Sequence, residues 1–300
     1  MLDDVIACLR CPQCARDPAP LRRSGNALRC EAGHSFDIAR SGYVSLLPAG
    51  SAKNAGDSAA MVQARHEFLA GGHYAGLASA LAELAGPVAS AAQAAGAAWA
   101  AGGCVVDVGA GTGYYLAAVL DRLPGAAGLA LDLSKSALKL AARSHPRAAA
   151  IGCDAWRGLP VADGAARLAL SVFAPRDGSE LRRVLGADGR LLVVTPGADH
   201  LAELVEPLGL LSVDPRKDER LTARLGPYFD LARQHQHRFR LALDHRDVAA
   251  AVAMGPSAWH ADPAELTGRI AALPSPMPVT VSVTMWTFRP ANQRDTRGLR

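Results

Sequence analysis

The stretch Val105–Tyr115, which reads VVDVGAGTGYY, decides the fold of this 300-residue chain. A short apolar strand runs into a turn with three glycines, and a helical pattern follows. Glycine lets the backbone approach a ligand closely where a side chain would block it, and the start of a helix attracts negative charge. The stretch therefore predicts a strand, a loop and a helix that together hold a nucleotide-type cofactor.

Strand and helix signals alternate from Cys104 onwards, which is typical of a parallel sheet with helices on both faces. Two later strand patterns, joined by a helix, complete a sheet whose last strand runs antiparallel. We therefore expect an α/β protein with a seven-stranded Rossmann-like sheet. The expected strands cover residues 104–109, 127–134, 148–155, 167–175, 190–197, 237–245 and 278–290.

Helical patterns flank these strands. Apolar residues recur at helical spacing over residues 59–70 and again over 74–84, with a glycine pair between the two patterns. Residues 178–189 predict a helix that ends in a glycine turn.

The spacing of the glycines distinguishes between two classes of cofactor. A dinucleotide-binding loop has its third glycine three residues after the second, whereas Gly113 follows Gly111 by two and Tyr114 occupies the expected position. Asp107 also precedes Gly109 by two residues. Both departures favour the loop of S-adenosylmethionine-dependent methyltransferases over an NAD-binding loop. The expected sheet is accordingly that of a class I methyltransferase.

Two further acidic residues end neighbouring strands and extend the predicted donor site. Asp132 closes the next strand, where a carboxylate accepts hydrogen bonds from both hydroxyls of a ribose. Asp154 closes the third strand, where an acid commonly meets the adenine amino group. Each acid alone is equally well interpreted as a solvated turn residue, but their combination with the glycine loop favours donor binding.

The fourth strand ends in SVFAP, residues 171–175, and this ending narrows the choice of acceptor. Enzymes that methylate exocyclic amines usually carry an Asn or Asp, two prolines and an aromatic residue there, and this motif is absent. A Pro-Cys pair for thiolate attack on cytosine C5 is absent as well. The sequence therefore argues against adenine-N6, cytosine-N4 and cytosine-C5 methylation.

The first segment carries a second motif, in which Cys11, Cys14, Cys30 and His34 give C-x2-C and C-x3-H separated by fifteen residues. Two such pairs can surround one tetrahedral zinc ion with sulfur and nitrogen ligands. Four protein ligands leave no position for substrate, so we expect a structural ion whose binding is coupled to folding. Cys8 lies outside this register and is treated as spare. The alternative is a set of free thiols with an incidental histidine.

Length and composition favour two domains, because 300 residues with 50% hydrophobic content support one large core and a small appended module. We expect a zinc-binding domain in residues 1–48, a linker and helices in 49–103, and a methyltransferase domain in 104–300. The net charge of +4 excludes a uniformly basic coat for nucleic acid, so any basic surface is local. Arginines outnumber acids around the metal ligands, which favours phosphate contacts but is also typical of a solvated face.

The opening residues, MLDDVIACLR, carry acids where a signal peptide has a basic start and an apolar core. Residues 85–103 are mostly alanine and glycine and are too weakly apolar for a membrane span. We therefore expect a cytoplasmic protein without a membrane segment. In that reducing compartment, close-spaced cysteines are more often metal ligands than disulfides.

Motifs along nearly the whole chain resemble the 23S ribosomal RNA guanine-N1 methyltransferases, a family that includes a branch conferring resistance to tylosin-type macrolides. The resemblance is dense through about His200, and beyond that point it rests mainly on one short motif and the last strand. The motifs are CPQC, RCEAGHSFDIARSGYVSLLP, GDSAAMVQARHEFLAGGHY, VVDVGAGTGYY, ALDLSKSALKLAAR, FAP, VVTPGADHL and PSAWHA.

The resemblance implies a zinc-binding, RNA-recognition domain on the same Cys and His ligands, and a donor site that involves Tyr74, Gly111, Thr112 and His200. Thr112 replaces a Glu found in some members. The segment around Asp154 differs among members. The family also implies a homodimer whose two zinc domains help to form a basic cleft for a hairpin of 23S rRNA, with no DNA partner.

The expected reaction is a direct displacement, in which guanine N1 attacks the sulfonium methyl group of S-adenosylmethionine. N1 carries a proton that must leave, and Asp177 and His200 are the candidate bases. Phe173 is a candidate for stacking on the extruded base, although a strand aromatic is more often part of a core. Two rivals stay open: a small-molecule S-adenosylmethionine-dependent methyltransferase, and a non-catalytic zinc-dependent RNA-binding protein.

Overall fold

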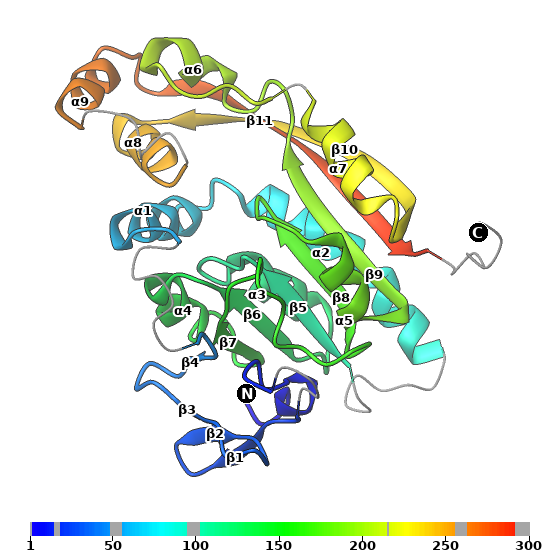
Figure 1. Ribbon diagram of the computed structural model, residues 1–300. Helices are drawn as coiled ribbons and strands as arrows, with labels where there is room; N and C mark the ends of the chain where they lie inside the picture. The colour runs from blue at the N-terminus through cyan, green and yellow to red at the C-terminus, as the bar shows by residue number, and fades with distance from the viewer. Residues whose placement is uncertain are drawn as a thin grey trace.

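An eight-stranded sheet forms the centre of the computed structural model, which describes residues 2–14, 19–48, 56–94, 103–214, 216–255 and 263–291 (Figure 1). The strands are β4 (Val44–Ser45), β5 (Cys104–Val108), β6 (Gly128–Asp132), β7 (Ala148–Gly152), β8 (Ala166–Val172), β9 (Leu185–Pro196), β10 (Phe229–Leu243) and β11 (Met277–Pro290). Their order is β10-β11-β9-β8-β5-β6-β7-β4. The strands from β9 to β4 run parallel, whereas β11 runs antiparallel to both β9 and β10.

The predicted α/β class and seven-stranded sheet are confirmed, with β4 as an additional short strand. The helices are η1 (Ile6–Cys8), α1 (Ala59–Ala70), α2 (Ala75–Ala94), α3 (Tyr114–Arg122), α4 (Lys135–Ala141), α5 (Gly178–Val184), α6 (Ala202–Leu208), α7 (Lys217–Leu225), α8 (His245–Ala253) and α9 (Pro263–Ala271).

Two expected boundaries differ from the structure. The second helix continues to Ala94, beyond the predicted residue 84, because its alanine-rich sequence favours a helix despite Pro87. The glycine turn predicted after α5 is wrong, since β9 already begins at Leu185, which pairs with Ala166 of β8. Most of the predicted linker, residues 49–55, and the motif PSAWHA lie outside the described residues.

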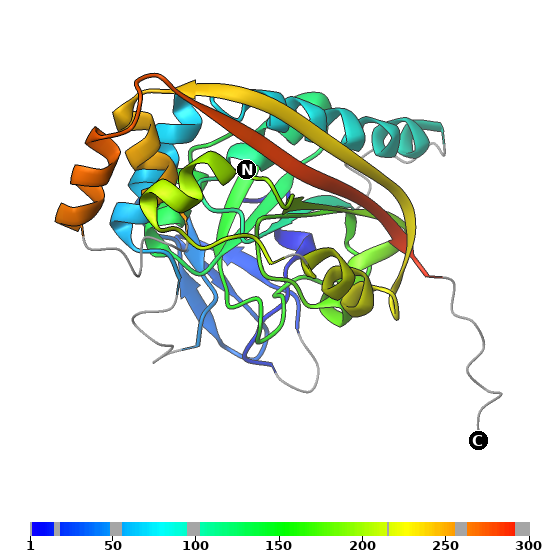
Figure 2. The same ribbon diagram turned by 90° about the horizontal axis from the view of Figure 1, so that it is seen from above.

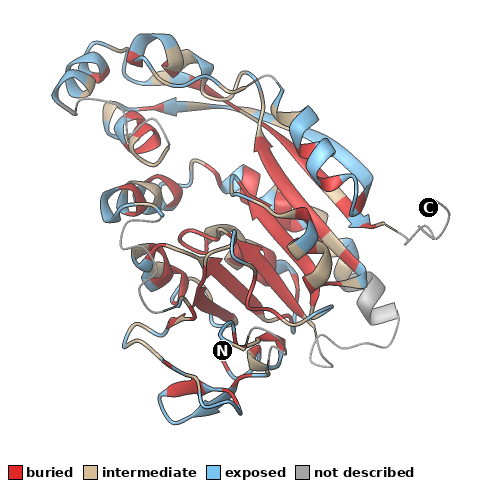
Figure 3. Cartoon of the chain, in the orientation of Figure 1, coloured by how far each residue is buried: buried red, intermediate tan, exposed pale blue. Residues whose placement is uncertain are grey.

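Two hydrophobic clusters cover the two faces of the sheet, because side chains alternate along each strand. Leu170 and Leu192 pack in the cluster that contains α2 and α3. Their neighbours Ala169 and Leu191 pack in the cluster that contains α5, α7 and the N-terminal segment. Strands β5 to β9 are accordingly the most deeply buried part of the chain (Figure 3). Because both faces of the sheet are packed, the ends of these strands have fixed positions relative to one another.

The N-terminal segment joins the main sheet directly (Figure 1). It contains a small antiparallel sheet of β1 (Arg22–Ser24), β2 (Ala27–Arg29) and β3 (Ser35–Asp37). Val44 of β4 pairs with Ile151 of β7, and Leu9 forms an isolated bridge with Val161. Residues 2–14 and 19–48, called the N-terminal module below, therefore share one hydrophobic core with the sheet.

Strands β10 and β11 form a long ribbon at the edge of the sheet (Figure 2). Only residues 283–288 of β11 pair with β9, so the other end of the ribbon extends past the parallel strands. The loop after β9 is tied to this extension, because the Leu201 N–H donates to the Thr280 carbonyl over 2.8 Å. The ribbon thereby holds the segment around His200 in place. Among the described residues, no helix combines the length and hydropathy that crossing a membrane requires.

Candidate donor site and metal centre

The loop after β5 requires glycine at three positions. Gly109, Gly111 and Gly113 have φ angles of 72°, 55° and 79°, in the left-handed region that favours glycine. A Cβ on Gly109 would lie 2.6 Å from the Cβ of Ala174, and one on Gly113 would lie 2.5 Å from the Ser144 hydroxyl. Strand ends and helices therefore crowd this loop so closely that only bare backbone fits. Thr112, the remaining predicted loop residue, is buried there.

Asp132, at the end of β6, supports the loop with both carboxylate oxygens. Oδ2 accepts from the Gly111 N–H over 2.8 Å, and Oδ1 accepts from the Ser134 N–H over 2.8 Å. Burial raises the pKa of Asp132, although these two hydrogen bonds act in the opposite direction. The predicted ribose contact remains a prediction, and the observed bonds hold the carboxylate beside the glycine loop.

Asp107 is a buried carboxylate without a hydrogen-bond partner among the described residues. Its side chain lies within β5, immediately before the glycine loop. Burial, and secondarily the charge of Asp132, raise the pKa of Asp107 to about 8. An orphaned buried acid is costly unless a ligand compensates it. A donor that carries sulfonium and ammonium charges fits this position, since a cation beside Asp107 stabilises the carboxylate.

Asp57, before α1, and Arg65, within α1, also lie near the glycine loop. Neither residue was among the predicted site residues. Arg65 pairs with Asp57 and donates to the Met254 carbonyl over 2.8 Å. Its Nη1 would lie 3.6 Å from a Cβ on Gly111, and the Ser134 hydroxyl donates to the Asp57 carbonyl over 2.9 Å. The motif GDSAAMVQAR contains both residues, but only the folded chain brings them to the glycine loop.

Three aromatic side chains from distant segments meet at the ends of β8 and β9. The Tyr74 hydroxyl lies 3.2 Å from Nε2 of His200, and Nδ1 of His200 lies 2.9 Å from the Ser282 carbonyl oxygen. The ring of Phe173 lies 5.8 Å from that of His200 and 6.4 Å from that of Tyr74, measured between centroids. We call Tyr74, Phe173 and His200 the aromatic cluster.

His200 is neutral in this environment, because burial lowers its pKa to about 4. Nδ1 lies 2.9 Å from the carbonyl oxygen and 3.3 Å from the backbone nitrogen of Ser282, and Nε2 lies beside the Tyr74 hydroxyl, so both ring nitrogens have hydrogen-bond partners. Burial also raises the pKa of Tyr74, so its hydroxyl keeps the proton. The cluster thus presents a neutral imidazole whose orientation is set from both sides.

Phe173 stands out for its backbone and its exposure. Its φ of 52° is rare for an aromatic residue, and its side chain is 39% exposed although it follows a buried strand. The Phe173 N–H donates to the Val194 carbonyl over 3.1 Å, which helps to hold this conformation. Strained residues of this kind cluster at functional sites. The ring is therefore available to a ligand rather than committed to the core.

The two remaining predicted acids have local partners. Asp154 follows β7, accepts from the Trp156 N–H over 3.0 Å and lies 3.6 Å from Arg157. Asp177 caps α5: its Oδ1 accepts from the N–H and hydroxyl of Ser179 and from the Glu180 N–H. These bonds lower the pKa of Asp177. The structure thus places His200 in the aromatic cluster and gives Asp177 a helix-capping role.

The four predicted metal ligands converge in the N-terminal module. Their ligand atoms all lie within 4.8 Å of one another. Nδ1 of His34 lies 3.5, 3.4 and 3.3 Å from the sulfurs of Cys11, Cys14 and Cys30, and the sulfurs of Cys14 and Cys30 are 3.7 Å apart. A tetrahedral zinc ion separates such ligand atoms by roughly 3.5–3.8 Å. The arrangement therefore fits zinc with four protein ligands.

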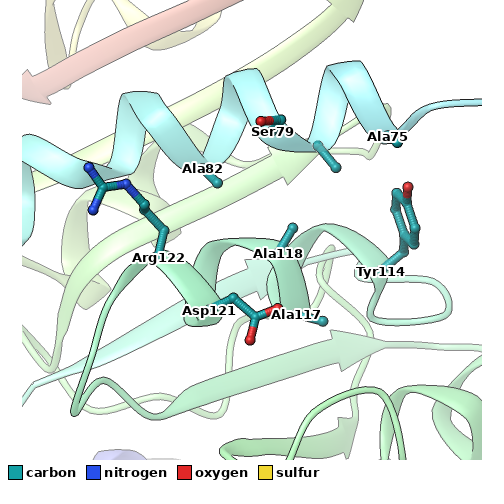
Figure 4. Close-up of a pocket in the computed structure, with 9 residues that line it drawn as sticks. Ala75, Ser79, Ala82, Tyr114, Ala117, Ala118, Asp121 and Arg122 are labelled. Carbon is teal, nitrogen blue, oxygen red and sulfur yellow. The ribbon is translucent and has the colours of Figure 1, made fainter. Parts of the chain in front are cut away.

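A separate surface groove lies between α2 and α3 (Figure 4). Alanines line most of it, with Asp121 and Arg122 at one side and Tyr114 at the other. Asp107, Asp132 and His200 are not among its lining residues. This groove is therefore distinct from the donor site.

Comparison with known proteins supports both parts of the site. Residues 9–54 match the family described as RlmA, N-terminal, a zinc ribbon, and residues 105–192 match a methyltransferase domain. The chain is 52% identical over 290 residues to the 23S rRNA (guanine(748)-N(1))-methyltransferase of Streptomyces fradiae, covering 97% of this chain and 99% of that protein.

Two further relatives carry provisional names as 23S rRNA (guanine-N(1)-)-methyltransferases. A protein of Micromonospora griseorubida is 53% identical over 299 residues, covering 97% of this chain and all of the relative. A protein of Bacillus subtilis (strain 168) is 31% identical over 261 residues, covering 84% of this chain and 87% of the relative.

Proposed function

Because this chain belongs to the family of 23S rRNA (guanine-N1)-methyltransferases, we propose that it methylates N1 of a guanine in a hairpin loop of 23S rRNA. The observation that carries the proposal is the near full-length similarity, which includes the metal-binding module as well as the methyltransferase domain. The enzyme depends on S-adenosylmethionine and binds one structural zinc ion. We assign the zinc to Cys11, Cys14, Cys30 and His34.

The donor is proposed to lie along the glycine loop, with Asp107 facing its positive charge and Asp132 its ribose. Asp154 is the proposed adenine contact, and Tyr74 and His200 close the opposite side. S-adenosylmethionine supplies the electrophilic methyl carbon. The chain's own contribution is alignment, since an in-line displacement depends on the angle between nucleophile, methyl carbon and leaving sulfur.

The guanine is proposed to stack on Phe173, whose exposed ring lies beside His200. Loss of the N1 proton requires an acceptor near the base. Both candidates already have hydrogen-bond partners, and His200 is favoured because it is neutral and lies beside Phe173 in the aromatic cluster. His200 is accordingly assigned the role of orienting N1 and accepting its proton.

RNA recognition is assigned to the N-terminal module. Arg22, Arg23 and Arg29 lie exposed on its small sheet, where Arg22 pairs with Glu31 and Arg23 with Asp3, and these arginines are the proposed phosphate contacts. We further propose that the chain works as a homodimer in the cytoplasm. We also propose that its target is the nucleotide of 23S rRNA that corresponds to guanine 748, which is named in the description of the Streptomyces fradiae relative, and that its methylation confers tylosin resistance. These four assignments rest on the family alone.

The deciding experiment is methyl transfer from radiolabelled donor to unmethylated 23S rRNA, followed by mass mapping of the product. Transfer to a guanine N1 is the expected result. Transfer to a metabolite but not to RNA would establish the small-molecule alternative. Absence of measurable donor affinity in calorimetry would instead establish the non-catalytic RNA-binding alternative.

A further inference from the structure

Helix α7 lies against the ends of the strands that carry the aromatic cluster. Near its start, Asp218 accepts a hydrogen bond from the Thr195 hydroxyl at the end of β9, over 3.3 Å. Near its end, the Arg224 carbonyl oxygen lies only 2.9 Å from the position of a Cβ on Gly178, the first residue of α5. The helix thus spans the region between His200 and the segment after Phe173.

Arg176 lies in that segment and has no acidic partner among the described residues. Its Nε donates to the buried Ser171 hydroxyl over 3.2 Å, and its Nη2 donates to the Ala174 carbonyl over 2.8 Å. Burial, followed by the charge of Arg224, lowers the pKa of Arg176 to about 10, which still leaves it charged at neutral pH. Arg183 on α5, by contrast, pairs with both Glu180 and Asp163.

Lys217 adds a second cation at the neighbouring strand end, because it precedes Asp218, which bonds to Thr195 of β9, whereas Arg176 bonds to Ser171, which pairs with Val193 of the same strand. It is half-buried, and its pKa is lowered by burial and then by the charge of Arg176. Lys217 also acts on His200, whose pKa it lowers. The acids nearby are already engaged, since Asp218 accepts from Thr195 and Asp214 pairs with Arg220. The site therefore combines two partly desolvated cations that form no ion pair among the described residues, although the charges of Asp218 and Asp214 also act on Lys217.

We propose that Arg176 and Lys217 bind the phosphodiester group adjacent to the guanine that is methylated. This inference rests on the proposed function. A phosphate supplies negative charge to two neighbouring cations that form no ion pair among the described residues, and a guanidinium can contact two of its oxygens at once. Arg176 bonds to Ser171 and Ala174, which stand on either side of Phe173 in the chain, so a nucleotide whose base stacks on Phe173 has its phosphate within reach. The contact holds the backbone of an extruded nucleotide while N1 is aligned.

An alternative ligand for Arg176 and Lys217 is the carboxylate of S-adenosylmethionine. Ala174 and Pro175 separate Arg176 from the glycine loop, since both approach the Cβ position of Gly109. The two ligands are distinguished by measuring donor affinity and RNA kinetics on the same variants.

The test compares Arg176→Gln and Lys217→Gln with Lys139→Gln, which removes the same charge from an exposed site on α4. We expect each of the first two variants to raise KM for a 23S rRNA hairpin about tenfold. The slope of log Kd against log salt concentration should decrease by about 0.7–0.9 for each phosphate contact removed. Donor affinity from calorimetry stays at the wild-type value, and Lys139→Gln changes none of these quantities.

A second arm uses the wild-type enzyme and a hairpin with one neutral methylphosphonate linkage beside the target guanine. Wild-type enzyme should lose about tenfold in kcat/KM on this RNA, and Lys217→Gln should lose little more, because both changes remove one contact. If Arg176→Gln does not fold, Lys217→Gln and the modified RNA still decide the question.

Four outcomes overturn the inference. If Arg176→Gln and Lys217→Gln have the same KM and salt dependence as Lys139→Gln, the two cations do not contact RNA. If the losses in kcat/KM from Lys217→Gln and from the methylphosphonate are additive, Lys217 contacts a different group. A tenfold loss of donor affinity would assign the cations to the donor carboxylate. If the wild-type enzyme transfers no methyl group to RNA, the proposed function itself fails and this inference fails with it.

Discussion

The Tyr74 hydroxyl and Nε2 of His200 lie 3.2 Å apart although 126 positions separate them in the chain. Tyr74 immediately precedes α2 and His200 follows β9, so their contact ties the helical segment before the sheet to the loop after it. The pair sets the orientation of the imidazole that the proposed mechanism uses. Four predictions test this pair and the other features of the site.

Tyr74→Phe should weaken donor binding by about fivefold and leave His200 with a buried, unpaired nitrogen. The reason is that the hydroxyl is the donor that satisfies Nε2. Calorimetry with S-adenosylmethionine measures the affinity. Tyr228→Phe is the matched control, because Tyr228 is 36% exposed and lies outside the aromatic cluster. Equal affinities for both variants would remove Tyr74 from the donor site.

Asp107→Asn should change how stability depends on pH. The pKa of Asp107 is about 8 in the folded chain and near 3.8 in the unfolded chain, so the folded state binds this proton more tightly. Asp107 therefore favours folding at low pH, and this contribution is lost as pH rises toward about 8. Urea denaturation between pH 5 and pH 9 should show a smaller decline in unfolding free energy for Asp107→Asn than for wild type. Parallel curves would contradict the buried, protonated state of Asp107.

Cys30→Ser should release the zinc ion and abolish RNA methylation while donor binding persists. Three ligands hold zinc less well than four, and the metal joins the two ligand pairs of the N-terminal module. Metal content, methyl transfer to RNA and donor calorimetry are the three measurements. Cys8→Ser serves as the control, because Cys8 lies outside the metal cluster. A Cys30→Ser protein without donor affinity would refute the assignment of RNA and donor binding to separate parts.

Gly109→Ala should destabilise the protein by roughly 1–3 kcal/mol and weaken donor binding. Two effects act there: the φ of 72° strains any residue with a Cβ, and that Cβ would lie 2.6 Å from Ala174. Gly125→Ala separates them, since Gly125 has a φ of 80° but a Cβ on it would meet no heavy atom within 4 Å. Thermal unfolding and calorimetry should show a larger loss for Gly109→Ala than for Gly125→Ala. Equal losses would mean that backbone strain alone matters.

Local patterns in the sequence already determined the class of fold and the two ligand-binding motifs. The alternation of strands and helices predicts the parallel sheet, and in such a sheet the strand ends meet at one edge. Asp107, Asp132 and Asp154 could be assigned to that edge from their places at strand ends. The spacing of the cysteines and the histidine predicted a metal cluster, because a short turn brings the two ligands of each pair together.

Tertiary structure alone decided which of these groups lack partners and which distant groups meet. Nothing in the spacing of Asp107 indicates that its carboxylate is orphaned, and nothing local brings Phe173 to His200 or Asp218 to Thr195. Asp177 stays a candidate base from its sequence position, and only the structure shows that its Oδ1 caps the start of α5. Burial and long-range contacts arise from how whole elements pack, and the sequence pattern of a single element carries too little information to predict them.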